Sequence, residues 1–260
     1  MKENKITIEA SKILSLSLDI GEHMLRVGGE TNRVEDTIIR ICKVYEIDRI
    51  DVFSIRSLII ATIKTSNEET LTQTRRIYSY GTDLSQLERL NSLSRYICQT
   101  KPSFNEIKDK IQQLSVSEPS IRWSSCLGYI LASSGFSIFF GGNLIDAAAA
   151  AIIGILIFLI DTFIKRESIN QLIYTFVCSI ITGLAAILFT KIGLGANVDK
   201  IIIGDIMLLI PGIPLINSVR DMLCGDIIAG LLRLTESILI AIAIACGFAI
   251  SLIILGGILH

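Results

Sequence analysis

Histidine, paired cysteine and clustered basic residues are scarce in this chain of 260 residues, and each scarcity excludes a class of function. The two histidines, His23 and His260, lie at opposite ends, and the six cysteines stand singly with no CxxC pair. We therefore expect neither a zinc site nor a disulfide framework, and interpret the cysteines as small, reduced apolar residues. The formal net charge of −1 argues against a nucleic-acid partner. No metal or other cofactor is expected.

Motifs of several enzyme classes are also missing. The sequence contains no GxxxxGK[ST] phosphate loop, no GxSxG and no HExxH. The chain is therefore not itself an ATP-driven pump, and we expect no catalytic residue and no enzyme activity. The first 30 residues carry charges throughout and lack the apolar core of a secretory signal. The first domain is expected to remain in the compartment of synthesis.

Charge is unevenly distributed, which indicates two domains. Overall 51% of the residues are hydrophobic, the mean hydropathy is +0.60, and 19% are charged, against about 25% in an ordinary soluble domain. The charges gather in the first part of the chain and become sparse beyond Pro119. We expect one domain over residues 1–119 and a second over residues 120–260.

The first domain is predicted to be a small α+β domain. Apolar residues recur at helical spacing from Ile13 to Leu25, and Gly28-Gly29 ends that helix. A second helix follows, with Asn32 expected as its cap and Glu35 completing a capping box. Short β-branched segments between residues 50 and 80 predict three strands. Two further helices are expected over residues 83–99 and 103–114.

Long apolar runs dominate the second domain. A buried helix of a soluble protein could account for one of them, but not for so many runs of about 17–25 residues. We therefore predict an α-helical transmembrane bundle of about five helices embedded in a lipid bilayer, over residues 124–140, 144–160, 169–190, 201–215 and 234–259.

Basic residues between the runs favour a cytoplasmic N-terminal domain. With that orientation Lys165, Arg166 and Arg220 fall on the inside, whereas Lys191 and Lys200 fall on the outside. The predicted location is the inner or plasma membrane, with several spans.

The fourth apolar run is interrupted by Pro211, Gly212 and Pro214, which predicts a broken helix. Breaks at membrane depth occur where they face protein or a watery cavity, and transporters present the resulting helix ends to ions and carboxylates. Ionisable residues at such depth usually line a pathway or pair with one another. The candidates here are Asp205, Asp221, Asp226, Arg220, Arg233 and Glu236, with Asn217 nearby.

Purely structural interpretations of these residues, without a role in transport, remain open. The proline segment fits a turn at the membrane interface, with Arg220 to Asp226 in a cytoplasmic loop. Arg233 and Glu236 fit an intrahelical pair at the membrane edge. Asp205, deep in its run, is the candidate most expected to be functional. Asp146 and Asp161, at the two ends of one run, are expected to be interfacial caps.

A second polar motif lies near the N-terminus and comprises Gly29, Glu30, Arg33, Glu35 and Asp36. One interpretation is a well-capped helix start. The other is a binding or hydrolytic pocket in the soluble domain.

Two motifs of this chain together resemble those of the threonine/serine exporter family. The first is Gly28-Gly29-Glu30-Thr31 with Arg33 and Glu35, and the second is Pro211-Gly212-Ile213-Pro214 with Asn217 and Arg220. The likeness is greatest to its split form, the YjjP-like larger subunit. The resemblance implies a cytoplasmic domain before the membrane part and a small YjjB-like membrane partner that supplies the remaining helices. It also implies export of small amino acids such as threonine and serine, or of dicarboxylates such as succinate. A homo-oligomer is possible.

These observations lead to one hypothesis and two rivals. The hypothesis places a small carboxylate at the Pro211–Pro214 break, held by Arg220 and the following helix N-terminus. Asp205, with Glu236, would take a proton or counter an amino group and so couple efflux to the proton gradient. The first rival is a membrane-anchored metabolite sensor or regulator without transport activity, and the second is a membrane-tethered hydrolase.

Overall fold

The computed structural model describes residues 2–47, 49–65, 68–79, 81–115, 123–163 and 170–256. The chain forms two compact units. The first comprises residues 1–118 and 213–234, and the second comprises residues 119–212 and 235–260. The expected domain boundary at Pro119, the loop residues Lys165 and Arg166, and His260 lie outside the described residues. The assignment of residues 213–234 to the first unit was not expected from the sequence.

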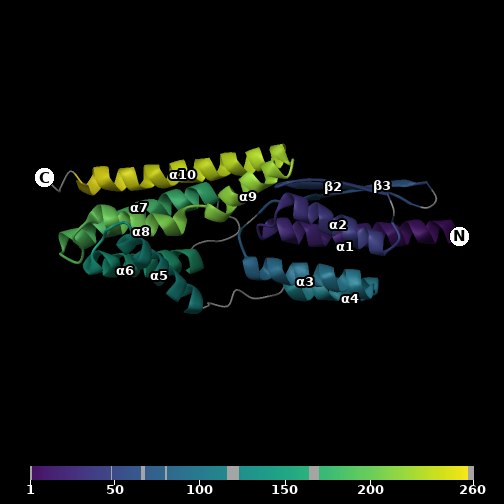
Figure 1. The fold of residues 1–260 in the computed structure, drawn as a ribbon, viewed down its shortest axis with the longest axis horizontal. Coiled ribbons are helices and arrows are strands. Elements are labelled where there is room, and N and C mark those ends of the chain that lie inside the picture. Colours follow the sequence, from purple (N-terminus) through teal and green to yellow (C-terminus); the bar gives the residue numbers. More distant parts are fainter. Residues whose placement is uncertain are drawn as a thin grey trace. The chain divides into compact units, whose positions relative to one another are not determined.

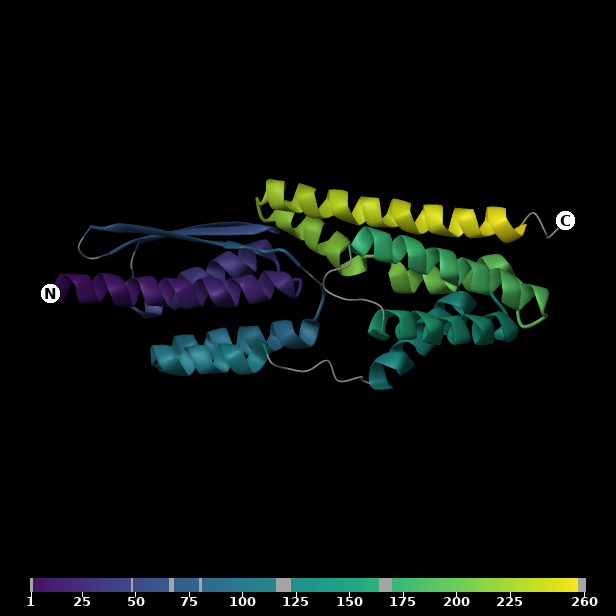
Figure 2. The same ribbon diagram turned by 180° about the vertical axis from the view of Figure 1, so that it is seen from behind.

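The first unit has three layers. In Figures 1 and 2, α1 and α2 lie between the sheet on one side and α3 with α4 on the other. Its elements are α1 (Lys2–Arg26), α2 (Thr31–Val44), β1 (Arg49–Ile55), β2 (Leu58–Lys64), β3 (Thr70–Arg76), α3 (Leu84–Thr100), α4 (Phe104–Ser115), α9 (Gly212–Leu223) and the first turns of α10 (Ile227–Gly256).

The three strands form an antiparallel sheet in the order β1-β2-β3. Along the central strand Ile59, Ala61 and Ile63 are fully buried and alternate with partly exposed residues. Because the burial alternates with a period of two residues, one face of the sheet points toward the helices. Leu14, Leu18 and Ile38 of these helices belong to the same hydrophobic core. The predicted α+β domain is confirmed.

The turn between α1 and α2 confirms one local prediction and corrects another. Gly28 has φ +93°, the left-handed conformation that glycine adopts readily at a helix end. The expected capping box is wrong, because α2 begins at Thr31 with Glu30 as N-cap and Asn32 lies within the helix. The carboxylate of Glu35 accepts the backbone N–H of Ser54 in β1 instead, at 2.6 Å.

The second unit is a helical bundle. It contains α5 (Trp123–Phe139), α6 (Leu144–Phe163), α7 (Gln171–Lys191), α8 (Val198–Leu209) and the rest of α10. Helix α5 packs against α6 and α8, and α7 packs against the same two helices. On α10, Gly247 lets the backbone approach α7 closely, since an added Cβ would lie 2.6 Å from the Cβ of Ser179.

Several helices meet the length and hydropathy of a membrane span. Among the described residues these are α6, α7 and residues 227–255 of α10, or four spans if α8 and α9, bent by 53°, count as one. The count of about five is not confirmed, and α5 is shorter than these three at 17 residues. Large apolar side chains such as Leu131, Ile173 and Ile253 are 61–76% exposed, as a lipid-facing surface requires. The chain is an integral membrane protein.

Candidate functional site

Within the first unit, the N-terminal motif lies against the segment that follows the proline break. The guanidinium of Arg220 on α9 forms an ion pair with Glu30 at 2.7 Å. The side-chain amide of Asn217, one turn earlier, donates to the carbonyl oxygen of Gly28 at 3.4 Å. Two motifs separated by almost 190 residues of sequence therefore meet in one polar cluster, which we call the motif junction.

Arg233, on α10, forms the buried part of the motif junction. Its Nη2 donates to the carbonyl oxygen of Gly29 at 3.1 Å, and its Nη1 lies 3.4 Å from Oδ2 of Asp221. The same carboxylate oxygen accepts the hydroxyl of Thr31 at 3.4 Å. The side chains of Arg233 and Asp221 are only 5% and 1% exposed, so this pair is desolvated in a way that the Arg220–Glu30 pair is not.

Glycine is required at the turn that supplies the backbone acceptors. A Cβ on Gly29 would lie 2.8 Å from the carbonyl oxygen of Met24, and Gly28 holds a positive φ. Any larger side chain at Gly29 would push the turn away from α1. The glycine pair thus fixes the two carbonyl groups to which Asn217 and Arg233 bind.

Two acidic residues of the first unit, Glu35 and Asp226, interact through their charges. Burial raises the pKa of Glu35, the hydrogen bond from the Ser54 N–H opposes this rise, and the nearby charge of Asp226 adds to it. Asp226 immediately precedes α10, where a carboxylate interacts favourably with the helix N-terminus. Its Oδ2 is buried and has no hydrogen-bond partner among the described residues.

Other residues of the two motifs do not join the junction. Arg33 is exposed, and Asp36 forms an exposed ion pair with Arg40 at 2.6 Å on the same helix. Glu236 is half-buried on α10 and belongs to the second unit, as does Asp205. Of the expected transport residues, the motif junction therefore contains Asn217, Arg220, Asp221 and Arg233, whereas Asp205 and Glu236 belong to the second unit.

The proline segment breaks the helix as predicted. Helix α8 ends at Leu209, and Ile210 is extended, the conformation favoured before a proline. Helix α9 begins at Gly212, with Pro214 in its first turn, where the missing N–H breaks no helical hydrogen bond.

Asp205 lies in the interior of the second unit and is fully buried. The Ser133 hydroxyl lies 2.9 Å from Oδ1 of Asp205 and also contacts the carbonyl oxygen of Ala150. A hydroxyl carries a single hydrogen, so Ser133 donates to one of these two acceptors or divides its hydrogen between them. Among the described residues Oδ2 has no hydrogen-bond partner, and neither has the buried hydroxyl of Ser137.

Gly204 brings α8 and α5 together at this point. A Cβ on Gly204 would lie 2.6 Å from the carbonyl oxygen of Ser133 and 3.0 Å from the Cβ of Ser137. The two serines, four residues apart on α5, were missed by sequence reasoning. Their spacing on one face of an uncharged helix was the available signal.

Asp146 has the expected capping role. Its backbone N–H is bound by the side chain of Asn143, and its own carboxylate accepts the Asn143 N–H at 3.1 Å. The carboxylate also accepts the backbone N–H groups of Ala196 and Asn197 at 2.7 and 2.8 Å. Asp146 therefore ties the start of α6 to the start of α8.

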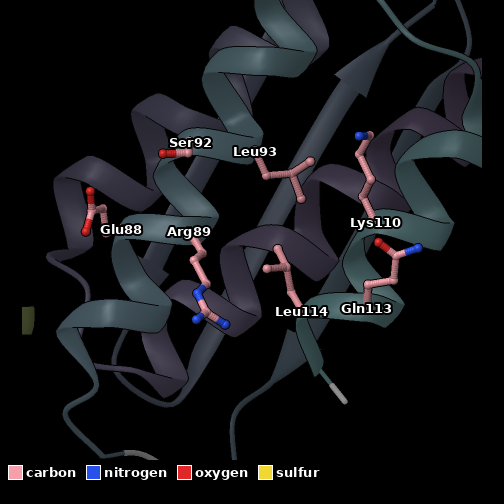
Figure 3. A pocket seen from close by; sticks show the side chains of 7 residues that line it. All are labelled: Glu88, Arg89, Ser92, Leu93, Lys110, Gln113 and Leu114. Atoms are coloured by element: carbon pink, nitrogen blue, oxygen red, sulfur yellow. The ribbon is translucent and has the colours of Figure 1, made fainter. Parts of the chain in front are cut away.

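A surface pocket of about 450 Å³ lies between α3 and α4 of the first unit. Figure 3 shows that its two cationic side chains, Arg89 and Lys110, point away from each other, and Glu88 adds the opposite charge. This open surface lacks convergent groups and is not the candidate site. No group of three or more His, Cys, Asp or Glu side chains that could hold a metal is found in the described part of the chain.

Comparison with known proteins adds a family to this geometry. The sequence model of the threonine/serine exporter (ThrE) family matches residues 15–255. The probable threonine/serine exporter of Mycobacterium tuberculosis is 22% identical over 247 residues, covering 94% of this chain but 46% of that protein. The probable succinate transporter subunit YjjP of Klebsiella aerogenes is 24% identical over 256 residues, covering 95% of this chain and 96% of that protein.

No solved structure is significantly similar. The chain thus spans about half the length of one curated relative and almost all of the other. A match of the family model to nearly the whole sequence shows that the chain belongs to the threonine/serine exporter family.

Proposed function

We propose that this chain is a subunit of a proton-coupled exporter of small amino acids or carboxylates, such as threonine, serine or succinate. Family membership and the names of both relatives support transport rather than catalysis. The observation that carries the proposal is the fully buried carboxyl group of Asp205, with one oxygen that has no partner among the described residues.

An ionisable group in that position requires an explanation. Burying a polar atom without a hydrogen bond costs about 1–3 kcal/mol by protein mutational data, and ionisable residues inside membranes usually serve transport. Asp205 lies about one helical turn before Leu209, the last residue of α8 before the break. We infer that it binds a proton, or the amino group of a substrate, during each transport cycle.

The motif junction is proposed to position the helix break. Glu30 accepts a hydrogen bond from Nη1 of Arg220, so a substrate carboxylate that binds Arg220 must displace Glu30 or share the cation with it. Helix α9 follows α8 directly in sequence and is held in the first unit through Arg220, Asn217 and Asp221. The soluble part of the chain could thereby control the break through α9.

A partner and an orientation complete the proposal. The longer relative is about twice the length covered here, and the other is named a subunit. These facts support a small YjjB-like membrane partner that supplies further helices. The N-terminal domain is proposed to be cytoplasmic. An N-terminal tag that protease cleaves in intact cells would contradict this orientation.

The proposal is tested by replacing Asp205 in the chain expressed with its partner. Asp205→Asn keeps the shape of the side chain and removes its titratable group. We therefore expect efflux of labelled substrate to fall at least about tenfold, which corresponds to roughly 1.4 kcal/mol. We also expect the remaining efflux to lose its pH dependence. Asp199→Asn is the matched control, because Asp199 lies on the same helix, is exposed and pairs with Lys200. Equal efflux and equal pH profiles in both variants would refute the role of Asp205.

A further inference from the structure

The hydroxyl of Ser137 is a buried polar group of the second unit to which the proposed function gives no role. The side chain is fully buried in the last turn of α5, and its Oγ has no hydrogen-bond partner among the described residues. Burying a hydroxyl without a partner costs about 1–3 kcal/mol by protein mutational data. The place of this hydroxyl, between one end of the bundle and Asp205, indicates a use that offsets the cost.

Ser137 lies one helical step from the Asp205 group. Ser133, four residues earlier on α5, places its hydroxyl 2.9 Å from Oδ1 of Asp205. A Cβ on Gly204, the residue before Asp205, would lie 3.0 Å from the Cβ of Ser137, and Figures 1 and 2 show α5 and α8 together in the bundle. Four helical residues advance by about 6 Å, which is about twice an O–H···O distance of roughly 2.8 Å. One water molecule therefore spans this step.

Ser137 also lies close to the end of the bundle at which α6 and α8 begin. The N–H of Gly142, in the turn after α5, donates to the carbonyl oxygen of Ser137 at 2.9 Å. A Cβ on Gly142 would lie 2.9 Å from Oγ of Ser137 and 3.2 Å from the Cβ of Lys200. Gly142 is partly exposed, and it has no side chain with which to shield the Ser137 hydroxyl from the bundle end.

Asp205 is within reach of the same end. Helix α8 begins at Val198, and seven residues at about 1.5 Å each place Asp205 about 10 Å along the helix. This distance is about a third of a hydrocarbon layer of roughly 30 Å. The hydroxyl of Ser137 divides it into two steps, each short enough for a chain of hydrogen bonds.

Toward the opposite end, the same face of α5 presents an aromatic ring. One step beyond Ser133 stands Tyr129, whose ring packs edge to face on Phe158 of α6 with the centroids 5.7 Å apart. A ring does not pass a proton along its length, whereas a small hydroxyl both accepts and donates. The hydroxyl path from Asp205 therefore leads toward Ser137.

The helices packed against α8 place their charged side chains in terminal turns. These are Asp146 and Asp161 of α6 and Lys191 of α7, while α5 has none. The other titratable side chains of these three helices are Cys126, Tyr129, Tyr174 and Cys178. Both phenols donate to Asp161, and on α8 itself Asp199 pairs with Lys200 in the first turn. At the level of Ser133, the carboxyl group that can take up a proton is that of Asp205.

We propose that Ser137 is a proton-relay residue, through which Asp205 exchanges its proton with the bundle end at which α6 and α8 begin. The inference rests on the proposed proton-coupled export and deepens it by naming the route of the proton. A proton from water at that end binds Oγ of Ser137, while the hydrogen of this hydroxyl passes through one bridging water to Oδ2 of Asp205. Ser137 is left unchanged, and the carboxylate becomes a neutral carboxyl group. Ser133 is a positioning residue, because its contact holds Oδ1 and leaves Oδ2 to receive the proton.

The test compares net efflux, which moves protons, with exchange, which does not. During exchange, labelled substrate leaves in return for unlabelled substrate, so Asp205 can keep its proton throughout. The full chain is expressed with the proposed YjjB-like partner, and labelled threonine and succinate are the probes. In Ser137→Ala we expect net efflux to fall at least about fivefold, exchange to keep the wild-type rate, and the unfolding temperature not to decrease.

Two further variants complete the experiment. Ser137→Thr keeps a hydroxyl and should restore net efflux. Ser134→Ala is the matched control on the same helix, because the Ser134 hydroxyl donates to the carbonyl oxygen of Ile130 at 2.7 Å and lies off the route. It should change neither net efflux nor exchange.

The outcomes separate the relay from the export function. Equal net efflux in the wild type and Ser137→Ala, with Asp205→Asn impaired, would overturn the relay and leave the proposed function intact. Loss of net efflux and exchange together in Ser137→Ala would assign Ser137 a structural role and would also overturn the relay. Normal, pH-dependent efflux in Asp205→Asn would contradict the proposed function itself, and the relay with it.

Discussion

At the scale of single residues, two arginines of the motif junction differ in burial, and this difference determines what each contributes to stability. The Arg220 side chain is 60% exposed beside Glu30, whereas Arg233 is 5% exposed beside Asp221. Exposed ion pairs contribute at most about 1 kcal/mol. Removing one partner of a buried pair costs about 3–5 kcal/mol, because the other charge is left without compensation.

We therefore predict that Arg233→Met lowers the free energy of unfolding by about 3–5 kcal/mol, and that Arg220→Met lowers it by at most about 1 kcal/mol. Denaturant unfolding of the chain in detergent measures both. The double variant Arg233→Met with Asp221→Asn should be more stable than Arg233→Met alone. Equal losses for Arg220→Met and Arg233→Met would show that burial does not govern the junction.

Glu35 gives the first unit a distinct pH response. Because burial raises its pKa, the folded unit holds this proton more tightly than the unfolded chain does. The stabilisation is complete below the unfolded pKa of about 4.3 and is lost as the pH rises through the higher folded value.

In Glu35→Gln we expect the unfolding temperature to decrease less than in the wild type as the pH rises above about 4.3. Glutamine can still accept the Ser54 N–H, so the local contact is kept. Asp36→Asn, the exposed neighbour paired with Arg40, serves as the control. Parallel pH profiles for Glu35→Gln and the wild type would contradict this assignment.

At the scale of elements, close helix contact through glycine governs the Asp205 site. Gly204→Ala introduces a methyl group 2.6 Å from the Ser133 carbonyl oxygen, and a backbone atom cannot rotate away. We predict that α5 and α8 separate at a cost of about 1–3 kcal/mol, the usual range for overpacking.

The matched control for Gly204→Ala is Gly135→Ala on α5, where an added Cβ meets no atom within 4 Å. Because alanine has a higher helix propensity than glycine, Gly135→Ala should stabilise the helix by up to about 1 kcal/mol. Thermal unfolding in nanodiscs compares the two variants. A loss of stability in Gly135→Ala as large as that in Gly204→Ala would show that the contact with Ser133 is not the cause.

The elements also show what sequence reasoning could and could not reach. Apolar runs and proline positions are local signals, so they predicted the α+β domain, the apolar helices and the break at Pro211. The junction between Glu30 and Arg220 depends on tertiary packing across about 190 residues, which no local pattern encodes. Ser133 and Ser137 carry no charge and were therefore inconspicuous until α8 placed Asp205 beside them.

At the scale of the whole molecule, the two polar groups belong to different units. The motif junction lies in the first unit and the Asp205 group in the second, and the chain passes from one to the other at the break before α9. This division fits an exporter in which one unit contains the transport site and the other regulates it. The chain matches about half of its longer relative, and the proposed exporter includes a second membrane subunit.

The most direct test of export is efflux from cells preloaded with labelled threonine or succinate. The chain is expressed alone, together with the proposed YjjB-like membrane partner, and as the Asp205→Asn variant of that pair. We predict efflux with the pair, little or none with the chain alone, and at least about a tenfold reduction in the variant. Absence of efflux of both compounds, with both proteins shown to be in the membrane, would contradict the exporter and favour a membrane-anchored sensor.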